Sequence, residues 1–579
     1  MSQSRSFSLT LSMLFILTLI SASFAITTPV SAATILVNSF ADNVTNDGLC
    51  TLREAIIAAN TDSVYNGCPA GNGEDTIALP KGTYTLNSQL PNITSQIIIN
   101  GSGASSTILQ ASACNPIDKP EGCTPANYRV FSVDSGSSLH INKLTIRHGY
   151  AENSGGGIQN LGTLIVMDSI LSGNLGASGG AVSNSGFAGI ERSVFSNNMA
   201  ESSQGGGSGG GIDNSGGTVL VDRSKFEDNY AAYGGGGIAN YNGAVAVTNV
   251  TLKNNRALYG GGILNASTSS PNTLNIVSST LSENIAFNDG GGIFGYYSEG
   301  DIKVTNSTFS GNTADSGGGI FAGVKNTLYL ESSTFTQNIA NQYGGVFTSG
   351  ILNFSNTIIA NSFTGSDCYV AWADGGSIGT NMHNLVGDGS CSVGGINFLS
   401  GNPKLGPLSN NGGPTQTHAL LADSPAIDAA FCDSSPVIDQ RGEPRPIGSA
   451  CDIGAFEFSP DPIISMAITI EEPVIGEEPD TEADIVSDPM NAIAAPTAIV
   501  AWNPPLTTFV YNQAYTITVI LAVADGYQYL DGSTMVSVND QSPDSVTFDD
   551  IERTLTVVYT FDALIKDEIS FIYLPLITR

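Results

Sequence analysis

The stretch GGGIANYNGAVAVTNVTLKNN at residues 235–255 holds both of the short patterns that recur along the middle of this chain. The first pattern is a glycine cluster that ends in an aliphatic residue, here Ile238. The second is an apolar residue, two variable residues and an asparagine, here Leu252 and Asn255. Between them, the segment AVAVT at 244–248 alternates like a short β-strand. One copy of the unit therefore predicts two or three short strands separated by turns.

Both patterns recur in phase from residue 154 to residue 361, and the aliphatic residues of the first are 24 to 30 positions apart. These aliphatic residues are Ile158, Val182, Ile212, Ile238, Ile263, Ile293, Ile320 and Val346. The second pattern gives the pairs Leu171/Asn174, Phe195/Asn198, Phe226/Asn229, Leu252/Asn255, Leu281/Asn284, Phe309/Asn312, Phe335/Asn338 and Ile358/Asn361. A period of this length predicts a solenoid, a propeller or an array of repeats.

The composition of the unit selects among these architectures. Three consecutive glycines in most units would break helices, and a propeller blade needs about 40 residues and four strands. One unit per coil gives an all-β, right-handed parallel β-helix, similar to the pectin-lyase-like solenoids. Equivalent residues of successive coils then stack, so we expect Phe226, Leu252, Leu281 and Phe309 in one interior column. The asparagines should stack at a bend, where their amides satisfy one another.

The charge of the chain excludes several classes of partner. Its 579 residues include 52 Asp and Glu against 20 Lys and Arg, for a formal net charge of -32. A nucleic-acid-binding surface needs a basic stripe, and anionic lipid also attracts basic segments. We therefore expect no nucleic-acid partner.

The first residues predict export. Residues 1–33 resemble a signal peptide: Arg5 precedes an apolar run from Phe7 to Ile20, and Val30-Ser31-Ala32 suits cleavage. No later stretch is long enough for an integral membrane span after signal removal. The chain is thus expected to be secreted, either extracellular or on the cell surface.

The cysteines agree with an oxidising compartment. Eight cysteines allow many pairings, and pairing between sequence neighbours is the simplest; each bridge would then staple one loop or cap. The structural disulfide candidates are Cys50 with Cys68, Cys114 with Cys123, Cys368 with Cys391, and Cys432 with Cys451.

Residues 34–150 are expected to form an N-terminal cap and the first coils of the solenoid. An amphipathic helix is predicted within this cap. Thr51 and Glu54 form a capping-box pattern, and Leu52, Ala55 and Ile56 share one face with Ala59. This helix can plug the open end of the rod. The stretch CTLREAIIAAN at 50–60 resembles the C-S-L-R-E-A motif domain of secreted bacterial β-helix proteins, with Thr51 in place of serine.

Two further resemblances concern the repeats and the segment on their C-terminal side. The paired motifs of residues 151–365 resemble the repeats of the polymorphic outer membrane protein family, which is associated with surface display and adhesion. Residues 366–458 are expected to form the last coils and a cap. Their motifs NGGPTQTHAL at 411–420, SPAID at 424–428, DQRG at 439–442 and CDIGAFE at 451–457 resemble the choice-of-anchor Q domain, which implies a surface location.

The remainder of the chain changes character twice. Residues 459–497 are acidic and contain proline, so we expect an extended linker there. Residues 498–579 return to β-patterning, as in YTITVIL at 515–521, and are similar to immunoglobulin-like β-sandwich modules.

Candidate chemistry is sparse. No catalytic, cofactor-binding or metal-binding residue is predicted, because the four histidines pair with no nucleophile at a recognisable spacing. Asp168, Arg192 and Arg223 share one phase, as either a sugar-binding ladder or a solvated charge row. Ca²⁺ at carboxylates beside glycine turns stays an alternative hypothesis; these are Asp213, Asp289 and Asp315. The polar residues expected to brace the C-terminal cap are Asp428, Asp439, Arg441 and Asp452.

The sequence therefore favours a secreted cell-surface β-helix protein with an adhesive, binding or structural role. Its expected partner is an extracellular glycan or the surface of a host or neighbouring cell. The alternative is a polysaccharide lyase or glycoside hydrolase that acts on an extracellular glycan. Trp372 and Trp502 are too isolated in sequence to build a platform for stacking sugars.

Overall fold

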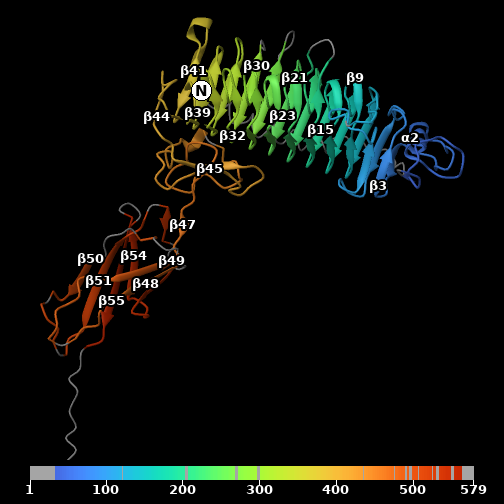
Figure 1. Ribbon diagram of the computed structural model, residues 1–579. Helices are drawn as coiled ribbons and strands as arrows, with labels where there is room; N and C mark the ends of the chain where they lie inside the picture. The colour runs from blue at the N-terminus through green and yellow to red at the C-terminus, as the bar shows by residue number, and fades with distance from the viewer. Residues whose placement is uncertain are drawn as a thin grey trace, which may run out of the picture.

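The computed structural model describes residues 33–563, apart from gaps at 120, 203–205, 268–271, 297–299, 435, 475, 489–491, 494–498, 506, 511, 525, 530–533 and 550–552. All of the expected signal peptide except Ala33 lies outside the described residues. Figure 1 shows an elongated rod, a cap beneath one end of it, and a separate β-sandwich.

The rod is a right-handed parallel β-helix, as predicted. Each coil runs through four sheets, which we number by the strands of one coil: sheet 1 contains β19 (Thr218–Asp222), sheet 2 contains β20 (Lys225–Glu227), sheet 3 contains β21 (Tyr230–Gly234) and sheet 4 contains β22 (Ile238–Tyr241). These sheets have 13, 13, eight and ten strands respectively. Each strand hydrogen-bonds in parallel to its counterparts in the next coils, for example β19 to β23 (Ala244–Thr248).

The interior columns confirm the predicted stacking. Phe226 pairs with Leu252, Leu252 with Leu281, and Leu281 with Phe309, and all four side chains are buried. The aliphatic residues of the glycine motif stack in the same way from Ile158 to Val346.

One predicted pair has the wrong register. The partner of Phe335 in the next coil is Ile359, whereas Ile358 pairs with Thr334. Both isoleucines are apolar, so spacing alone could not separate them. Asn361 therefore lies one position before the asparagine column rather than in it.

The asparagines form the expected buried ladder at the bend between sheets 2 and 3. In every coil but the last, the side-chain amide donates to the side-chain oxygen of the next asparagine at 2.9–3.0 Å. Each amide also donates to a backbone carbonyl of the preceding coil, as for Asn198, Asn229 and Asn255. The column contains Asn174, Asn198, Asn229, Asn255, Asn284, Asn312 and Asn338. Because every polar atom finds a partner, seven amides can be buried without a large desolvation cost.

In most clusters the glycine three positions before the stacked aliphatic residue is required by its backbone. Gly235 has φ 66°, and a Cβ there would lie 2.3 Å from the carbonyl oxygen of Ile238. Only glycine accepts this left-handed bend and the close approach of the chain.

Helix α2 (Leu52–Thr61) closes the N-terminal end of the rod. Thr51 and Glu54 form both hydrogen bonds of the predicted capping box. Leu52, Ala55 and Ile56 are buried in the same core as the first coils. A disulfide between Cys50 and Cys68 joins the start of the helix to the loop that follows it.

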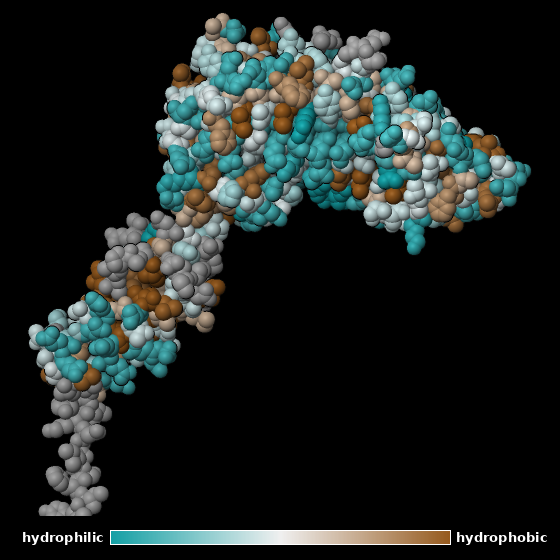
Figure 2. Space-filling model, viewed as in Figure 1, coloured by the Kyte–Doolittle hydropathy of each residue, from teal (hydrophilic) through white to brown (hydrophobic). Residues whose placement is uncertain are grey.

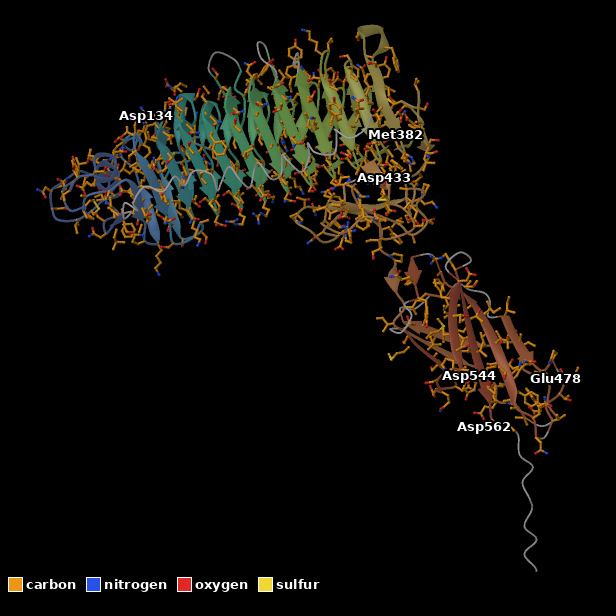
Figure 3. All side chains as sticks on the ribbon, turned by 180° about the vertical axis from the view of Figure 1, so that it is seen from behind. Asp134, Met382, Asp433, Glu478, Asp544 and Asp562 are labelled. Carbon is orange, nitrogen blue, oxygen red and sulfur yellow. A yellow bond between two sulfur atoms is a disulfide. The ribbon has the colours of Figure 1, made fainter. Side chains whose placement is uncertain are left out.

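A cap folds back beneath the other end of the rod. It contains the antiparallel pair β45 (Leu405–Ser409) and β46 (Thr417–Leu420). Gln440 donates to Thr280 Oγ1 at 2.9 Å and accepts from Thr308 Oγ1 at 2.6 Å, so the cap covers the outer face of sheet 2 there. Seen from behind in Figure 3, Asp433 of the cap lies below Met382 of the last coils.

The sandwich begins earlier than predicted. The prediction of an extended linker at 459–497 is wrong. Strands β48 (Ser465–Thr469) and β49 (Asp484–Asp488) lie in that segment and form a three-stranded sheet with β53 (Met535–Val538). Met466 and Ile468 are buried against Ile517 and Val519 of the facing four-stranded sheet. The alternating apolar residues of β48 can be buried despite the acidic composition, because the nearby Glu471 and Glu472 are exposed to solvent.

The structure joins the eight cysteines as four neighbouring pairs; besides Cys50–Cys68 these are Cys114–Cys123, Cys368–Cys391 and Cys432–Cys451. Within the described part of the chain, every helix is too short or too polar to span a bilayer.

Candidate functional site: a polar groove and an aromatic strip

One outward column of the rod has a left-handed backbone in every coil. It precedes the asparagine ladder by one residue, and its φ angles lie between 53° and 65°. From the N-terminal end its members are His148, Gly173, Asn197, Asp228, Asn254, Glu283, Gly311, Gln337 and Asn361. Asparagine, aspartate, histidine and glycine tolerate this conformation better than other residues. The side chains therefore project outward at regular intervals.

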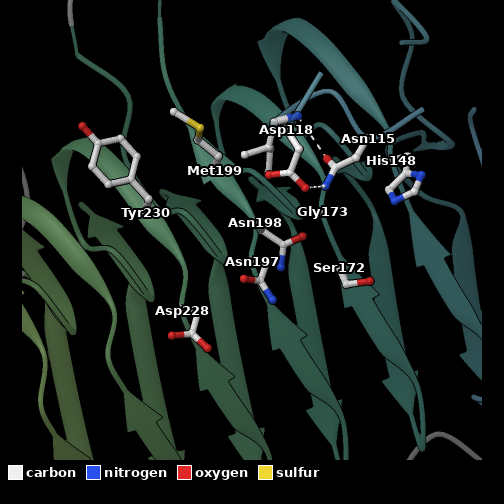
Figure 4. Close-up of a pocket in the computed structure, with 11 residues that line it drawn as sticks. Asn115, Asp118, His148, Ser172, Gly173, Asn197, Asn198, Met199, Asp228 and Tyr230 are labelled. Carbon is white, nitrogen blue, oxygen red and sulfur yellow. Dashed lines mark hydrogen bonds between the residues drawn. The ribbon is translucent and has the colours of Figure 1, made fainter. Parts of the chain in front are cut away.

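The first four members of this column line a groove of about 410 Å³. Its opposite wall is the loop stapled by Cys114–Cys123, which contributes Asn115, Ile117 and Asp118. In Figure 4, Asp118 and Asn115 lie near His148, and Tyr230 and Met199 lie at the other end of the groove. The groove thus combines amide, carboxylate and imidazole groups with a few apolar surfaces.

The loop that forms the wall is rigidly built. Asn115 Nδ2 donates to Asp118 Oδ2 at 2.8 Å, and Asn115 Oδ1 accepts from the backbone N–H of Ile117 at 3.0 Å. The backbone N–H of Lys119 donates to the carbonyl of Asn115 at 3.1 Å. These local bonds hold the Asp118 carboxylate at the groove while it stays exposed to solvent.

His148 is the best-defined polar group of the groove. Its Nδ1 lies 2.9 Å from the carbonyl oxygen of Ser112, so Nδ1 carries the proton. Burial lowers the pKa of His148 below its usual value, which keeps the ring neutral at neutral pH. In that form Nε2 is an acceptor, suited to a hydroxyl donor.

Gly173 forms the floor of the groove. A Cβ at this position would lie 3.1 Å from Cδ2 of His148 and 3.5 Å from the side-chain amide of Asn115. Gly311 is in the same column, and a Cβ there would meet only Glu283, at 3.9 Å. A side chain would therefore fill the groove at Gly173 but not disturb the equivalent coil farther along.

A second feature runs along sheet 4. Its outward column passes through β22, β26 (Ile263–Ala266), β30 (Ile293–Tyr296), β34 (Ile320–Ala322), β38 (Tyr343–Thr348) and β41 (Ser366–Val370). Successive residues of the column are Ala239, Leu264, Phe294, Phe321, Phe347 and Tyr369. Tyr233, Tyr259, Tyr296 and Tyr343 flank it, and we call these four and the column's four aromatic residues the aromatic strip.

The eight rings of the strip form one continuous set of contacts. Ring centroids are 5.2 Å apart for Phe294 and Phe321, 4.5 Å for Phe321 and Phe347, and 5.9 Å for Phe347 and Tyr369. Tyr259 connects Tyr233 to Phe294 at 5.5 and 4.9 Å. Phe294 is buried, whereas Tyr233, Tyr296 and Tyr369 are 39, 44 and 38% exposed. The strip therefore has a packed base and an accessible rim.

Sequence reasoning missed this strip because it considered only the tryptophans. Trp372 is exposed near β41, and Trp502 packs against Phe509 and Phe561 inside the sandwich. The signal was present: Phe294, Phe321 and Phe347 each follow the stacked aliphatic residue of the glycine motif directly. A residue next to an inward position on a strand points outward.

The charged row expected at Asp168, Arg192 and Arg223 is a set of solvent-exposed turn residues. All three have positive φ, between 44° and 48°. Arg192 pairs with Asp168 at 2.8 Å, and Arg223 pairs with Asp222 at 2.7 Å and with Glu191 at 2.5 Å. Hydrogen bonding to Arg192 lowers the pKa of Asp168. In the space-filling view of Figure 2, hydrophilic residues cover much of the visible side of the rod.

The three aspartates considered for calcium do not form one cluster. Asp213 lies in the outward column of sheet 4, paired with Ala239, and burial raises its pKa to about 7. Asp289 and Asp315 lie near each other, and burial, followed by the charge of Asp315, raises the pKa of Asp289. Among the described residues, no group of three or more histidine, cysteine, aspartate or glutamate side chains is placed to hold a metal.

The polar residues of the cap are engaged in bracing it. Arg441 pairs with Asp439 at 2.8 Å and lies over the ring of Phe456. Asp452 accepts a backbone hydrogen bond from Asp428 at 2.7 Å, and burial raises its pKa to about 7.

Comparison with known proteins gives a local match and distant structural similarities. The Chlamydia polymorphic membrane protein repeat matches residues 306–323, which contain one copy of each sequence pattern. No curated protein matches the chain. The catalytic domain of a GH87 alpha-1,3-glucanase, solved with tetrasaccharides, has 14% identity and a TM-score of 0.37, covering 62% of this chain and 70% of that one. Pectate lyase Pel9A has 14% identity and a TM-score of 0.36, covering 74% of this chain and 97% of its own.

Proposed function

We propose that this is a secreted cell-surface β-helix protein that binds a neutral extracellular glycan in the polar groove, with an adhesive role. The observation that carries the proposal is the composition of the groove. Asn115, Asp118 and Asp228 offer amide and carboxylate groups for sugar hydroxyls. His148 adds a neutral imidazole, and Tyr230 adds an aromatic surface. The volume of about 410 Å³ is in the range of small-ligand sites.

Electrostatics disfavours an acidic ligand. Asp118 and Asp228 both line the groove, and the whole chain has a formal net charge of -32. An acidic glycan would approach a negatively charged protein and meet two carboxylates, which costs free energy. A neutral sugar instead gains charge-assisted hydrogen bonds from the same carboxylates.

The cell-surface assignment is supported by three features. Four disulfides are typical of extracellular proteins. The polymorphic membrane protein repeat matches residues 306–323, part of one coil. The resemblances of residues 50–60 and 411–457 to the C-S-L-R-E-A and choice-of-anchor Q domains point the same way.

Filling the groove tests the proposal. Gly173→Asn puts an amide on the groove floor, and asparagine already occupies this column at Asn197 and Asn254. We expect the variant to lose at least tenfold in affinity for whichever neutral oligosaccharide the wild type binds on a glycan array, measured by calorimetry. Gly311→Asn is the matched control and should bind normally. Equal binding by both variants would remove the groove from the proposal.

Catalysis is the second candidate, because two carboxylates, Asp118 and Asp228, line a groove that has the neutral His148 at one end. Most glycoside hydrolases use a pair of catalytic carboxylates, and a lyase needs a general base near the sugar. Release of reducing ends and absorbance of unsaturated products, measured on the same glycans, separate this candidate from binding. Turnover that Asp228→Asn abolishes would establish the enzyme.

A further inference from the structure

We infer that the aromatic strip is a second binding surface, which carries an extended neutral β-1,4-linked glycan onward from the groove. The inference rests on the proposed function, since the groove would hold one part of the same chain. It adds a second site and narrows the ligand to long, extended polymers.

The strip and the groove share a strand. β21 supplies Tyr230 to the lining of the groove and Tyr233 to the start of the strip, three residues later. From Tyr233 the ring contacts continue through Tyr259 and Phe294 toward Tyr369. A polymer that leaves the groove beside Tyr230 therefore meets aromatic side chains in each following coil.

The repeat of the strip suits a polymer. Coils of a parallel β-helix stack about 4.8 Å apart, and the rings of Phe294, Phe321 and Phe347 follow that repeat at 5.2 and 4.5 Å. An extended β-1,4-linked glycan advances by a similar distance per sugar. Successive sugars can thus make equivalent contacts with successive coils, which a compact or branched ligand cannot do.

The chemistry of the strip disfavours acidic polymers and self-association. None of the six residues of its outward column is charged, from Ala239 to Tyr369. Tyrosine hydroxyls flank the rings and suit the hydroxyl groups at the edge of a sugar. A net charge of -32 opposes both acidic polymers and a second copy of this chain. A neutral polysaccharide offers apolar C–H faces to the rings, and the negative charge of the protein does not repel it.

The rim of the strip provides clean variants. Tyr233, Tyr296 and Tyr369 are 39, 44 and 38% exposed, so their replacement by serine removes rings of the rim and keeps the buried Phe294, which loses its contact with Tyr296. Tyr329 is a matched control: it is 38% exposed and lies on sheet 1, in β35 (Thr327–Glu331), away from the strip. Circular dichroism and thermal unfolding would check that both proteins fold like the wild type.

The experiment compares cellotriose with hydroxyethyl cellulose as probes, by calorimetry on the full chain. The wild type is expected to bind the polymer at least tenfold tighter than the trisaccharide. The triple variant Tyr233→Ser, Tyr296→Ser, Tyr369→Ser should lose that gain but keep its affinity for the trisaccharide. Tyr329→Ser should change neither affinity.

The remaining outcomes are decisive in different ways. Full polymer affinity in the triple variant, with trisaccharide binding intact, overturns the strip and leaves the groove proposal standing. A shift in oligomeric state in the triple variant, seen by sedimentation, makes the strip a self-association surface and overturns the inference. If the wild type binds neither probe, the β-1,4-glycan assignment of the strip is wrong, and the array and Gly173→Asn decide the groove separately.

Discussion

Two neighbouring columns of the rod, one inward and one outward, differ in the residue types that they accept. The inward column holds asparagine in seven successive coils, from Asn174 to Asn338. The outward column, one residue earlier, holds six residue types among its members: histidine, glycine, asparagine, aspartate, glutamate and glutamine. Both take the same backbone path, coil after coil. The inward side chain must bond to the coils above and below. The outward one must accept a positive φ, and a bond that it makes to another coil, such as that from Asn254 to Asp228, lies at the surface.

This difference teaches where to look for function in a solenoid. An inward column is determined by stacking and says little about ligands. An outward column carries whatever the surface needs, provided that its backbone conformation is tolerated. The groove and the aromatic strip are both built from outward columns.

The largest expected effect comes from breaking the inward column. Asn255→Ala removes four side-chain hydrogen bonds, with Asn229, Phe226 and Asn284, at 2.9–3.2 Å. It leaves buried groups of the neighbouring coils without partners, so we expect a loss of about 3–5 kcal/mol in the free energy of unfolding. Urea denaturation followed by circular dichroism measures it.

The adjacent residue supplies the control for that measurement. Asn254 lies in the outward column, where Gly173 and Gly311 already show that glycine is tolerated. Asn254→Gly should change the unfolding free energy by less than about 0.5 kcal/mol. Similar losses in Asn255→Ala and Asn254→Gly would show that the two columns are not distinguished by burial and hydrogen bonding.

The inward columns could be predicted from the sequence because repetition of residue type is itself the signal. The solenoid, its interior columns and the capping box can all be inferred from spacing and residue chemistry. The register of the last repeat could not be predicted, since Ile358 and Ile359 are equally apolar and only strand pairing separates them. The start of the sandwich was hidden because acidic residues surround the short alternating strand at Met466 and Ile468.

The candidate site could be predicted less well from the sequence than the fold. The groove needs the loop around Asn115 to dock beside coils up to Tyr230, a contact between residues far apart in the chain. The repeat pattern of the sequence does not predict this contact. The aromatic strip was readable in principle, because Phe294, Phe321 and Phe347 occupy one phase. It escaped notice because the fold does not require aromatic residues at outward positions.

Asp213 is an exception among the outward residues, because its side chain is buried. It therefore tests whether burial, rather than an inward position, determines the effect of a residue on stability. Only 5% of it is exposed, Ser215 donates to its Oδ2 at 3.0 Å, and burial raises its pKa to about 7 from 3.8. The folded protein therefore binds a proton more tightly than the unfolded chain does. As a result, stability falls as the pH rises from about 4 to about 7, and above that the charged carboxylate stays a burden on the fold.

Asp213→Asn should remove this burden. We expect the variant to be about 2–4 kcal/mol more stable than the wild type at pH 8, with little difference at pH 4, where both side chains are uncharged in the fold. Urea midpoints at the two pH values measure the effect. A gain of the same size at both would point to packing and not to titration.

The smallest effect is expected in the exposed charge row, which tests whether outward residues matter to the fold at all. Asp168→Asn removes the pair with Arg192, in which the two side chains are 33 and 38% exposed, and keeps a residue that tolerates φ 48°. Exposed pairs contribute little, because water and salt screen them. Hydrogen bonding to Arg192 lowers the pKa of Asp168, so the pair is absent only at strongly acidic pH. We expect no resolvable shift in the urea midpoint at neutral pH in about 0.15 M salt, and a clear loss there would mean that this row, like the asparagine ladder, helps to hold the coils together.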